Sequence, residues 1–324
     1  MAPLVKHVLV AGKLHPLGRR ILDAAHGVTV KYIDEISEAS YAPFIEEADA
    51  LLIRTQPMTA ATVAMAQRLQ IVSRHGVGYD AVDIEALNAR GIPLAICGDV
   101  NSTSVAEQAA MMMLAASKLA IRADNAVRTG NWNWRNKLET QDVNGRNLLL
   151  IGFGRIGRRI ASVVRGFGLQ IRAYDPYLAK HGWPNSTIPP VATLDEGLAW
   201  ADIISLSVPH SGEPLIGASE FRQMRDGVIV VNTARGGIVD ESAMVAALQS
   251  GKVRAVGLDV FANEPVLLYE PLNQFDQAIL SPHIAGLSAG AAERMAEAAA
   301  RNILDFFANR LDHTLVVNRE YLNG

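Results

Sequence analysis

The sequence predicts an α/β protein of two doubly wound domains, each built on a parallel sheet. Short apolar runs alternate with helical segments along most of the 324-residue chain. Continuous apolar strands separated by helices are typical of parallel sheets that are covered on both faces. The alternation occurs twice, which suits a length that allows two domains of roughly 100–200 residues each. We expect a first, substrate-binding domain over 1–99, completed by the C-terminal segment 287–324, and a second, cofactor-binding domain over 100–286.

The first domain begins with an apolar stretch that predicts a strand. Residues 1–12 contain only a short apolar run, followed by Lys13, and have no small-residue cleavage site, so a signal peptide is not expected. The sequence Gly91-Ile92-Pro93 stops the last helix of this half. The expected strands are 8–10, 29–32, 50–53, 71–73 and 94–96, and the expected helices are 16–25, 60–67 and 83–90.

The second domain opens on a long helix, predicted over 104–127. Its methionines, Met111 to Met113, are typical of core or subunit packing. An alanine-rich last helix over 289–308 follows the second sheet and is expected to return to the first domain. The other expected strands are 148–151, 170–174, 203–208, 228–232, 255–258 and 279–281, and the other expected helices are 155–167, 194–199, 219–224 and 241–250.

Composition and charge restrict the class of function. Hydrophobic residues make up 49% and charged residues 19%, and the net charge of −3 indicates neither a nucleic-acid nor a membrane-surface partner. The most apolar segment, 109–121, is interrupted by Lys118 and is shorter than the roughly 18–20 apolar residues of a membrane span. The single cysteine, Cys97, is interpreted as a small buried hydrophobe. We expect a cytoplasmic protein without disulfides and predict no metal site.

Residues 152–157 have the G-x-G-x-x-G spacing of a dinucleotide-binding turn. The motif follows an apolar strand and opens a helix, which makes the signal far more specific than the glycines alone. Gly152 permits the tight turn, Gly154 lets a pyrophosphate approach the backbone, and Gly157 lets helix and strand pack closely. The helix N-terminus offers free N–H groups to the phosphates, with Arg155 and Ile156 among the expected contacts.

Asp175 predicts that the dinucleotide is NAD. It ends the next strand, 18 residues after Gly157. A carboxylate there accepts hydrogen bonds from both ribose hydroxyls and repels the 2′-phosphate of NADP. The next residue, Pro176, has no group that could bind that phosphate. Arg158 and Arg159 are interpreted as a solvated helix face.

Three residues that suit reduction of a 2-oxo acid follow strands of the second domain. Arg235, Glu264 and His283 are expected at one edge, because successive parallel strands end there. An arginine binds a carboxylate or carbonyl, a histidine delivers a proton as hydride arrives, and a glutamate orients that histidine and favours its protonated form. Taken singly, each has an ordinary structural interpretation: a surface charge, a turn and a structural histidine.

The sequence resembles the D-isomer-specific 2-hydroxyacid dehydrogenases from about residue 53 to residue 309. Residues 75–80, His-Gly-Val-Gly-Tyr-Asp, resemble the family's substrate-carboxylate loop, and residues 101–107 resemble the segment that opens its cofactor domain. The resemblance implies a Rossmann cofactor domain and a flavodoxin-like substrate domain. It also implies that Arg235, Glu264 and His283 are catalytic.

The resemblance implies further site residues and a homodimer. Backbone N–H groups of Val77 and Gly78 would bind the substrate acid, and Arg54 matches a position that often faces substrate. Expected cofactor contacts outside the glycine turn and Asp175 are Ser104, Pro209, Thr233, Arg235 and Asp259, the last near the nicotinamide carboxamide.

The chain departs from the family pattern in places. The loop after residue 209 is short, and His210 in it is interpreted as a surface residue more readily than a functional one. Trp132 and Trp134 are expected at a subunit contact, and in some relatives a tryptophan here reaches the partner's active site. Because the sequence ends at Gly324, we expect no regulatory domain of the kind that some phosphoglycerate dehydrogenases carry.

These features predict an NAD-dependent dehydrogenase of a small D-2-hydroxy acid. Hydroxypyruvate, glyoxylate and 3-phosphoglycerate all suit a loop that binds a carboxylate by its backbone. Two alternatives stay open: a cofactor-sensing binding protein like the family's corepressors, and a formate or phosphite dehydrogenase of the same superfamily. Glu264 speaks against formate dehydrogenase, in which a glutamine usually partners the histidine.

Overall fold

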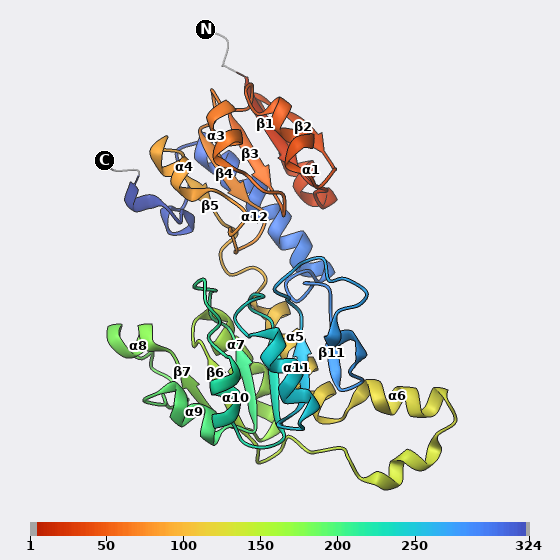
Figure 1. Cartoon of the computed structure of the whole chain (residues 1–324). Coiled ribbons are helices and arrows are strands. Elements are labelled where there is room, and N and C mark those ends of the chain that lie inside the picture. Colours follow the sequence, from red (N-terminus) through yellow and green to blue (C-terminus); the bar gives the residue numbers. More distant parts are fainter. Residues whose placement is uncertain (1–4, 322–324) are drawn as a thin grey trace. The chain divides into compact units, whose positions relative to one another are not determined.

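The computed structural model describes residues 5–321, and contacts divide the chain into two compact units (Figure 1). Unit 1 consists of Met1–Asn101 with Leu287–Gly324, and unit 2 of Ser102–Gly286. Residues 1–4 of the expected first strand segment and residues 322–324 of the expected C-terminal segment lie outside the described residues. Both units carry a parallel sheet with helical crossovers, so the predicted pair of doubly wound α/β folds is confirmed.

Unit 1 has a five-stranded sheet in the order β2-β1-β3-β4-β5, the flavodoxin-like order. Strand β3 is apolar and buried throughout, and β1 is buried from Val8 to Ala11, because helices cover both faces. The strands are β1 (Lys6–Ala11), β2 (Val28–Ile33), β3 (Ala50–Ile53), β4 (Ile71–Arg74) and β5 (Leu94–Ala95). The helices are α1 (Pro16–Asp23), α2 (Glu38–Tyr41), α3 (Ala60–Met65), α4 (Ile84–Ala89) and α12 (Ala289–Phe307), with 3-10 turns at Ala42–Phe44, His313–Leu315 and Arg319–Tyr321.

Helix α12 returns to unit 1, as expected. Ser288 caps its N-terminus by accepting a hydrogen bond from the Ala291 N–H group. Its alanines allow a close approach to α1, where a Cβ at Gly18 would lie 2.9 Å from the Ala296 carbonyl oxygen. The small residues are therefore a packing feature of the first core.

Unit 2 has a six-stranded parallel sheet in the order β11-β10-β9-β8-β6-β7. Helices α5 and α7 cover one face and α9 to α11 the other. The strands are β6 (Asn147–Ile151), β7 (Gln170–Tyr174), β8 (Ile203–Leu206), β9 (Val228–Asn232), β10 (Val253–Leu258) and β11 (Ala278–Leu280). The helices are α5 (Ser102–Ser117), α6 (Ala120–Arg128), α7 (Arg155–Val164), α8 (Pro176–His181), α9 (Leu194–Trp200), α10 (Ala218–Gln223) and α11 (Glu241–Gln249), with 3-10 turns at Trp132–Lys137, Arg165–Phe167 and Pro271–Gln274.

The order in which strands are added to the sheet of unit 2 reverses between β6 and β8. The chain passes from β6 to β7 on one side and then crosses to β8 on the other side of β6. Ligands of open α/β sheets bind outside the carboxyl ends of the strands at such a switch point. The residues that follow β6 and β8 are therefore where a cofactor is expected.

The prediction of one helix over 104–127 is wrong. The chain forms α5 and α6, separated at Leu119, whose backbone is left-handed with φ of +48°. Leu119 is nonetheless 2% exposed, so burial of its side chain offsets a conformation that costs roughly 1–2 kcal/mol. Arg122 fixes the new direction by ion pairs with Glu139 at 2.8 Å and Asp276 at 2.5 Å. Tertiary packing here overrides a continuous helical pattern.

The two buried methionines of α5 belong to the core, which was one of the two roles expected for them beside subunit packing. Met112 and Met113 are 0% and 2% exposed, whereas Met111 is 44% exposed. A Cβ at Gly257 of β10 would lie 2.6 Å from the Met112 Cβ, so the helix packs directly on the sheet. Cys97 is buried, as predicted. Among the described helices, none combines the length and the apolar character that crossing a bilayer requires.

Candidate active site

The glycine turn follows β6 at the switch point, and its three glycines have different surroundings. Gly152 has φ of +91°, and a Cβ there would lie 2.5 Å from the Ser207 carbonyl oxygen after β8. A Cβ at Gly157 would lie well inside 3.0 Å of the Gly152 carbonyl oxygen. Around Gly154, in contrast, a Cβ would meet nothing within 4 Å. Protein packing explains Gly152 and Gly157, and the open space at Gly154 suits an approaching pyrophosphate.

Helix α7 begins directly at this turn. Its first intrahelical bond joins the Arg158 N–H group to the Gly154 carbonyl oxygen, so the N–H groups of the preceding turn have no helical acceptor. Arg155 is exposed and Ile156 half-buried at the start of the helix. Aligned N–H groups at a helix N-terminus attract phosphate.

Asp175 directly follows β7, beside the glycine turn, and accepts hydrogen bonds from two backbone N–H groups. One carboxylate oxygen accepts from the Phe153 N–H group at 2.9 Å, and the other accepts from Leu178 at 3.0 Å as the cap of α8. The carboxylate is therefore fixed in orientation beside the turn. Each oxygen keeps a second lone pair, so both can still accept from a ribose hydroxyl.

Two buried hydroxyls after neighbouring strands have no hydrogen-bond partner among the described residues. They are Ser207 Oγ, just after β8, and Thr233 Oγ1, just after β9. A buried polar group without a partner is costly, so these atoms suit a bound polar ligand at the switch point. Ser207 was missed from the sequence, although a serine that ends an apolar strand before Pro209 is a signal for it. Pro209 is exposed, and Ser104 is buried in the first turn of α5.

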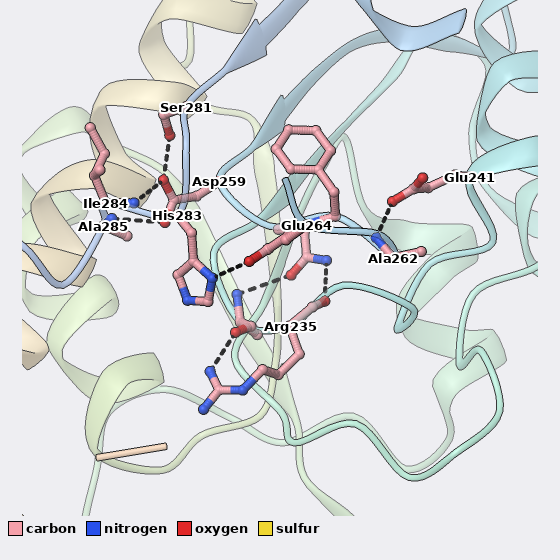
Figure 2. A network of polar contacts seen from close by, with 12 residues as sticks. Arg235, Glu241, Asp259, Ala262, Glu264, Ser281, His283, Ile284 and Ala285 are labelled. Atoms are coloured by element: carbon pink, nitrogen blue, oxygen red, sulfur yellow. Dashed lines mark hydrogen bonds and ion pairs between the residues drawn. The ribbon is translucent and has the colours of Figure 1, made fainter. Parts of the chain in front are cut away.

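His283 and Glu264 form a hydrogen-bonded pair (Figure 2). Glu264 Oε2 lies 2.7 Å from His283 Nδ1, and Glu264 Oε1 accepts from the Phe261 N–H group at 3.0 Å. The glutamate is therefore anchored in its own loop while it holds the ring. Within the described chain, His283 Nε2 makes no hydrogen bond. With side-chain exposures of 50% and 35%, the pair is accessible to a substrate.

Asp259 holds the loop that carries His283. Its side chain is 0% exposed and accepts from Ser281 Oγ and from the N–H groups of Ile284 and Ala285 at 2.9 and 2.7 Å (Figure 2). Its backbone carbonyl oxygen accepts from the His283 N–H group at 2.8 Å. His283 has φ of +52°, which is strained for a residue with a side chain and persists only where its surroundings enforce it. Asp259 supplies that enforcement, and its expected contact with a nicotinamide stays a prediction.

Arg235 follows β9 in a loop that packs on the Glu264 loop. The Asn232 side chain donates to the Arg235 carbonyl oxygen at 2.8 Å, and Arg235 Nη1 donates to Ala234 at 2.7 Å. A Cβ at Gly236 would lie well inside 3.0 Å of the Phe261 carbonyl oxygen. The two loops therefore meet backbone to backbone, and His283, from a third loop, contacts the Glu264 loop through its hydrogen bond with Glu264.

The expected substrate residues of unit 1 lie after β3 and β4. In the described chain, the N–H groups of Val77 and Gly78 make no hydrogen bond, so they are available to an anion. Arg54 donates to the Lys13 carbonyl oxygen at 2.7 Å, its Nε is buried without a partner, and no described carboxylate pairs with it. Burial lowers the pKa of Arg54 below its ordinary value, because charge without a counterion is desolvated. The expected site residues thus fall into two groups, one on each unit.

His75 is buried at the start of the same loop and is 5% exposed. Burial, with the charges of Arg54 and Arg74, lowers the pKa of His75 to about 3. The ring is therefore neutral at physiological pH. A neutral ring supports the loop without adding charge beside two arginines.

We expect acid to destabilise the protein through His75. Its folded-state pKa lies below the unfolded value of about 6.5, so unfolding takes up a proton in acid. The stabilising contribution is complete above that value and is lost as pH falls toward the folded-state pKa, by about 2 kcal/mol at about pH 5. Urea unfolding at neutral and acid pH measures the loss. His75→Gln should lose less than the wild type, and the exposed control His26→Gln should match the wild type. Equal losses in all three proteins would contradict the prediction.

Three further residues, His210, Trp132 and Trp134, have open roles. His210 is exposed after β8, and its Nε2 would lie 3.0 Å from a Cβ at Gly237, so its ring covers the Arg235 loop. Trp132, 67% exposed, and Trp134 lie on the 3-10 turn Trp132–Lys137 that follows α6. Trp134 Nε1 is buried without a hydrogen-bond partner.

Comparisons with known proteins agree on one family. A sequence profile described as D-isomer specific 2-hydroxyacid dehydrogenase, NAD binding domain, matches residues 110–285. The D-3-phosphoglycerate dehydrogenase of Mycobacterium tuberculosis (strain ATCC 25618 / H37Rv) is 38% identical over 290 residues, which are 89% of this chain and 54% of that protein. The chain thus spans about half the length of that relative.

A second relative matches along nearly its whole length. The glyoxylate reductase of Thermococcus onnurineus (strain NA1) is 35% identical over 326 residues, 98% of this chain and 97% of that protein. Among solved structures, the NADPH-dependent glyoxylate/hydroxypyruvate reductase from Sinorhizobium meliloti in complex with citrate is 27% identical with a TM-score of 0.84, covering 97% of this chain and 98% of that chain. The named substrates of these relatives thus differ, and the Sinorhizobium enzyme is named as NADPH-dependent.

Proposed function

Because the chain belongs to the D-isomer-specific 2-hydroxyacid dehydrogenase family, we propose that it transfers a hydride between NAD and a small D-2-hydroxy acid or its 2-oxo counterpart. The observation that carries the proposal is the 2.7 Å contact of Glu264 with His283 Nδ1, which leaves Nε2 without a protein partner. An oriented imidazole with one accessible nitrogen suits proton transfer to or from a substrate oxygen.

NADH supplies the hydride in the direction of reduction. Protonated His283 gives the Nε2 proton to the carbonyl oxygen and becomes neutral, so the 2-oxo acid gains one hydride and one proton. Glu264 keeps Nδ1 occupied and thereby fixes which nitrogen faces the substrate. Arg235 holds the substrate carboxylate or carbonyl through its planar guanidinium. In oxidation the neutral His283 accepts the proton.

The N–H groups of Val77 and Gly78 are proposed to bind the substrate carboxylate. Arg54 adds positive charge from the neighbouring strand, because no described carboxylate neutralises it. Binding by backbone reads only the acid group that all candidate substrates share. Hydroxypyruvate, glyoxylate and 3-phosphoglycerate therefore remain the proposed substrate class.

A substrate panel tests the function. Each 2-oxo acid is offered with NADH and with NADPH, and the absorbance of the reduced nicotinamide is followed. Turnover of at least one acid with NADH supports the proposal. NAD binding without turnover of any acid or of formate would instead favour a cofactor-sensing binding protein.

We expect Asp175→Ala to relax the preference for NAD over NADP. The Asp175 carboxylate is fixed by Phe153 and Leu178, and a 2′-phosphate close to it would be repelled by about 4 kcal/mol at 4 Å in a medium of intermediate dielectric. The ratio of kcat/KM for the two cofactors should shift toward NADP by about ten-fold or more. Because the substitution also removes a helix cap, Asp83→Ala, which uncaps α4, is the matched control. An unchanged ratio in Asp175→Ala would refute the role given to this carboxylate.

A homodimer through α5, α6 and the turn after them is also proposed. Exposed apolar side chains gather on these neighbouring segments of unit 2, and such surface favours association. They are Met111, Ile121, Val127, Trp132 and Leu138, with exposures from 44% to 85%. Sedimentation velocity distinguishes the dimer from a monomer.

A further inference from the structure

A cavity of 730 Å³ lies along β7, the edge strand of unit 2. Its lining includes Asn147 and Gln170, the first residues of β6 and β7, and Trp200, which precedes β8. Asn147 and Gln170 begin their strands, whereas the glycine turn and Asp175 follow the opposite ends. Of residues 152–157 only Phe153 lines the cavity, and Asp175 does not. The cavity therefore borders the glycine turn at Phe153 but includes none of its glycines, and its volume suits a small organic ligand.

The cavity carries positive charge in a chain whose net charge is −3. Arg158, Arg165 and Arg172 line it, and no aspartate or glutamate does. Arg172 is neutralised by Glu196 at 3.6 Å and lies over the Trp200 ring. Arg158 and Arg165 form no ion pair within the described chain. Two uncompensated arginines at one cavity attract an anion.

Arg158 lies on α7, and Arg165 is the residue directly after its end, where the backbone is still helical with φ of −54° and ψ of −38°. Arg158, Ala161, Ser162 and Arg165 are spaced i, i+3, i+4 and i+7, so they form a single stripe, and all four line the cavity. The small side chains between the arginines leave room there. The two Cα atoms are about 10 Å apart along the helix, so two long side chains can converge on one group between them. The Ser162 hydroxyl adds a donor at the centre.

Apolar side chains also line the cavity, and Trp183 behind them orders two of these residues. The Trp183 ring stacks on Phe153 with centroids 5.2 Å apart, and Trp183 Nε1 donates to the Ile188 carbonyl oxygen at 3.1 Å; Phe153 and Ile188 line the cavity. Half-buried Leu169 and Ile171 extend this apolar surface into the cavity. A ligand that fills the space therefore has an apolar part as well as an anionic group.

We propose that this cavity binds a small organic phosphate, with the phosphate between Arg158 and Arg165 and the organic part against Leu169 and Ile171. Guanidinium groups bind phosphate through paired N–H donors. The organic part is held by removal of apolar surface from water. The site lies on the helix that begins at the glycine turn but uses other residues.

Calorimetric titration tests the proposal with phenyl phosphate and inorganic phosphate as probes. NAD is present so that the glycine turn is filled. Phenyl phosphate should bind one-to-one, more tightly than inorganic phosphate and less tightly as salt rises. R158Q/R165Q should weaken it by about ten-fold or more. The control R222Q removes an exposed arginine of α10 and should bind as the wild type does. Both arginines are exposed, one on α7 and one at the residue that follows it, so circular dichroism should show an unchanged fold.

Three outcomes would overturn the site. The first is no heat from phenyl phosphate up to about 10 mM, a concentration that would fill a site with a Kd of about 1 mM. The second is equal affinity for phenyl phosphate and inorganic phosphate, which would show that the apolar lining does not contribute to binding. The third is unchanged binding in R158Q/R165Q. Because the double variant is compared with R222Q under the same conditions, the result does not depend on whether the protein is a dehydrogenase.

Discussion

His283→Ala is expected to lose about 10²–10⁴-fold of kcat while NAD still binds. Glu264 occupies His283 Nδ1 at 2.7 Å, so Nε2 is the nitrogen of the ring that can reach a substrate. Without it, no positioned group gives a proton to the substrate oxygen as hydride arrives. The glycine turn follows β6, whereas His283 follows β11, so the substitution changes no residue of that turn and NAD affinity should be preserved. Steady-state kinetics and an NAD titration measure the two effects.

Two variants make the result specific. Glu264→Gln keeps a hydrogen-bonding group beside the ring but removes the charge, so it should lose less kcat than His283→Ala. His313→Ala removes an exposed histidine of unit 1 and should retain wild-type turnover. Near-normal kcat in His283→Ala would contradict the assignment. An equal loss in the His313→Ala control would point to a general effect on the fold.

The parts of the fold that repeat were predictable from the sequence. Most buried strands contain a continuous apolar run, and neighbouring parallel strands require a crossover connection, which is usually a helix. The contact of His283 with Glu264 was also predictable, because residues that follow neighbouring parallel strands meet at one edge. The catalytic roles of His283, Glu264 and Arg235 stay predictions.

The features that sequence analysis missed depend on tertiary contacts. The break at Leu119 occurs inside a good helical pattern and is explained by burial of the leucine side chain. Helix α8 was not predicted, although Asp175 followed by Pro176 is a cap followed by proline at the first helical position. The left-handed backbone of His283 has no sequence signal, because it is imposed by Asp259 from another strand.

Gly236→Ala is expected to lower kcat/KM by about 100-fold, although the glycine carries no chemical group. The added Cβ would lie well inside 3.0 Å of the Phe261 carbonyl oxygen and 2.7 Å from the Ala262 nitrogen, and both are backbone atoms that cannot rotate away. The Arg235 loop must therefore move from the Glu264 loop, and a displacement of about 1 Å at a reacting group costs about 10²-fold. Overpacking should also destabilise the fold by about 1–3 kcal/mol. Kinetics and urea unfolding measure both effects, with Gly166→Ala as the control, because a Cβ there meets nothing within 4 Å. Wild-type kcat/KM in Gly236→Ala would show that the two loops need not touch for catalysis, and the site would then depend on His283 and Glu264 without a fixed Arg235.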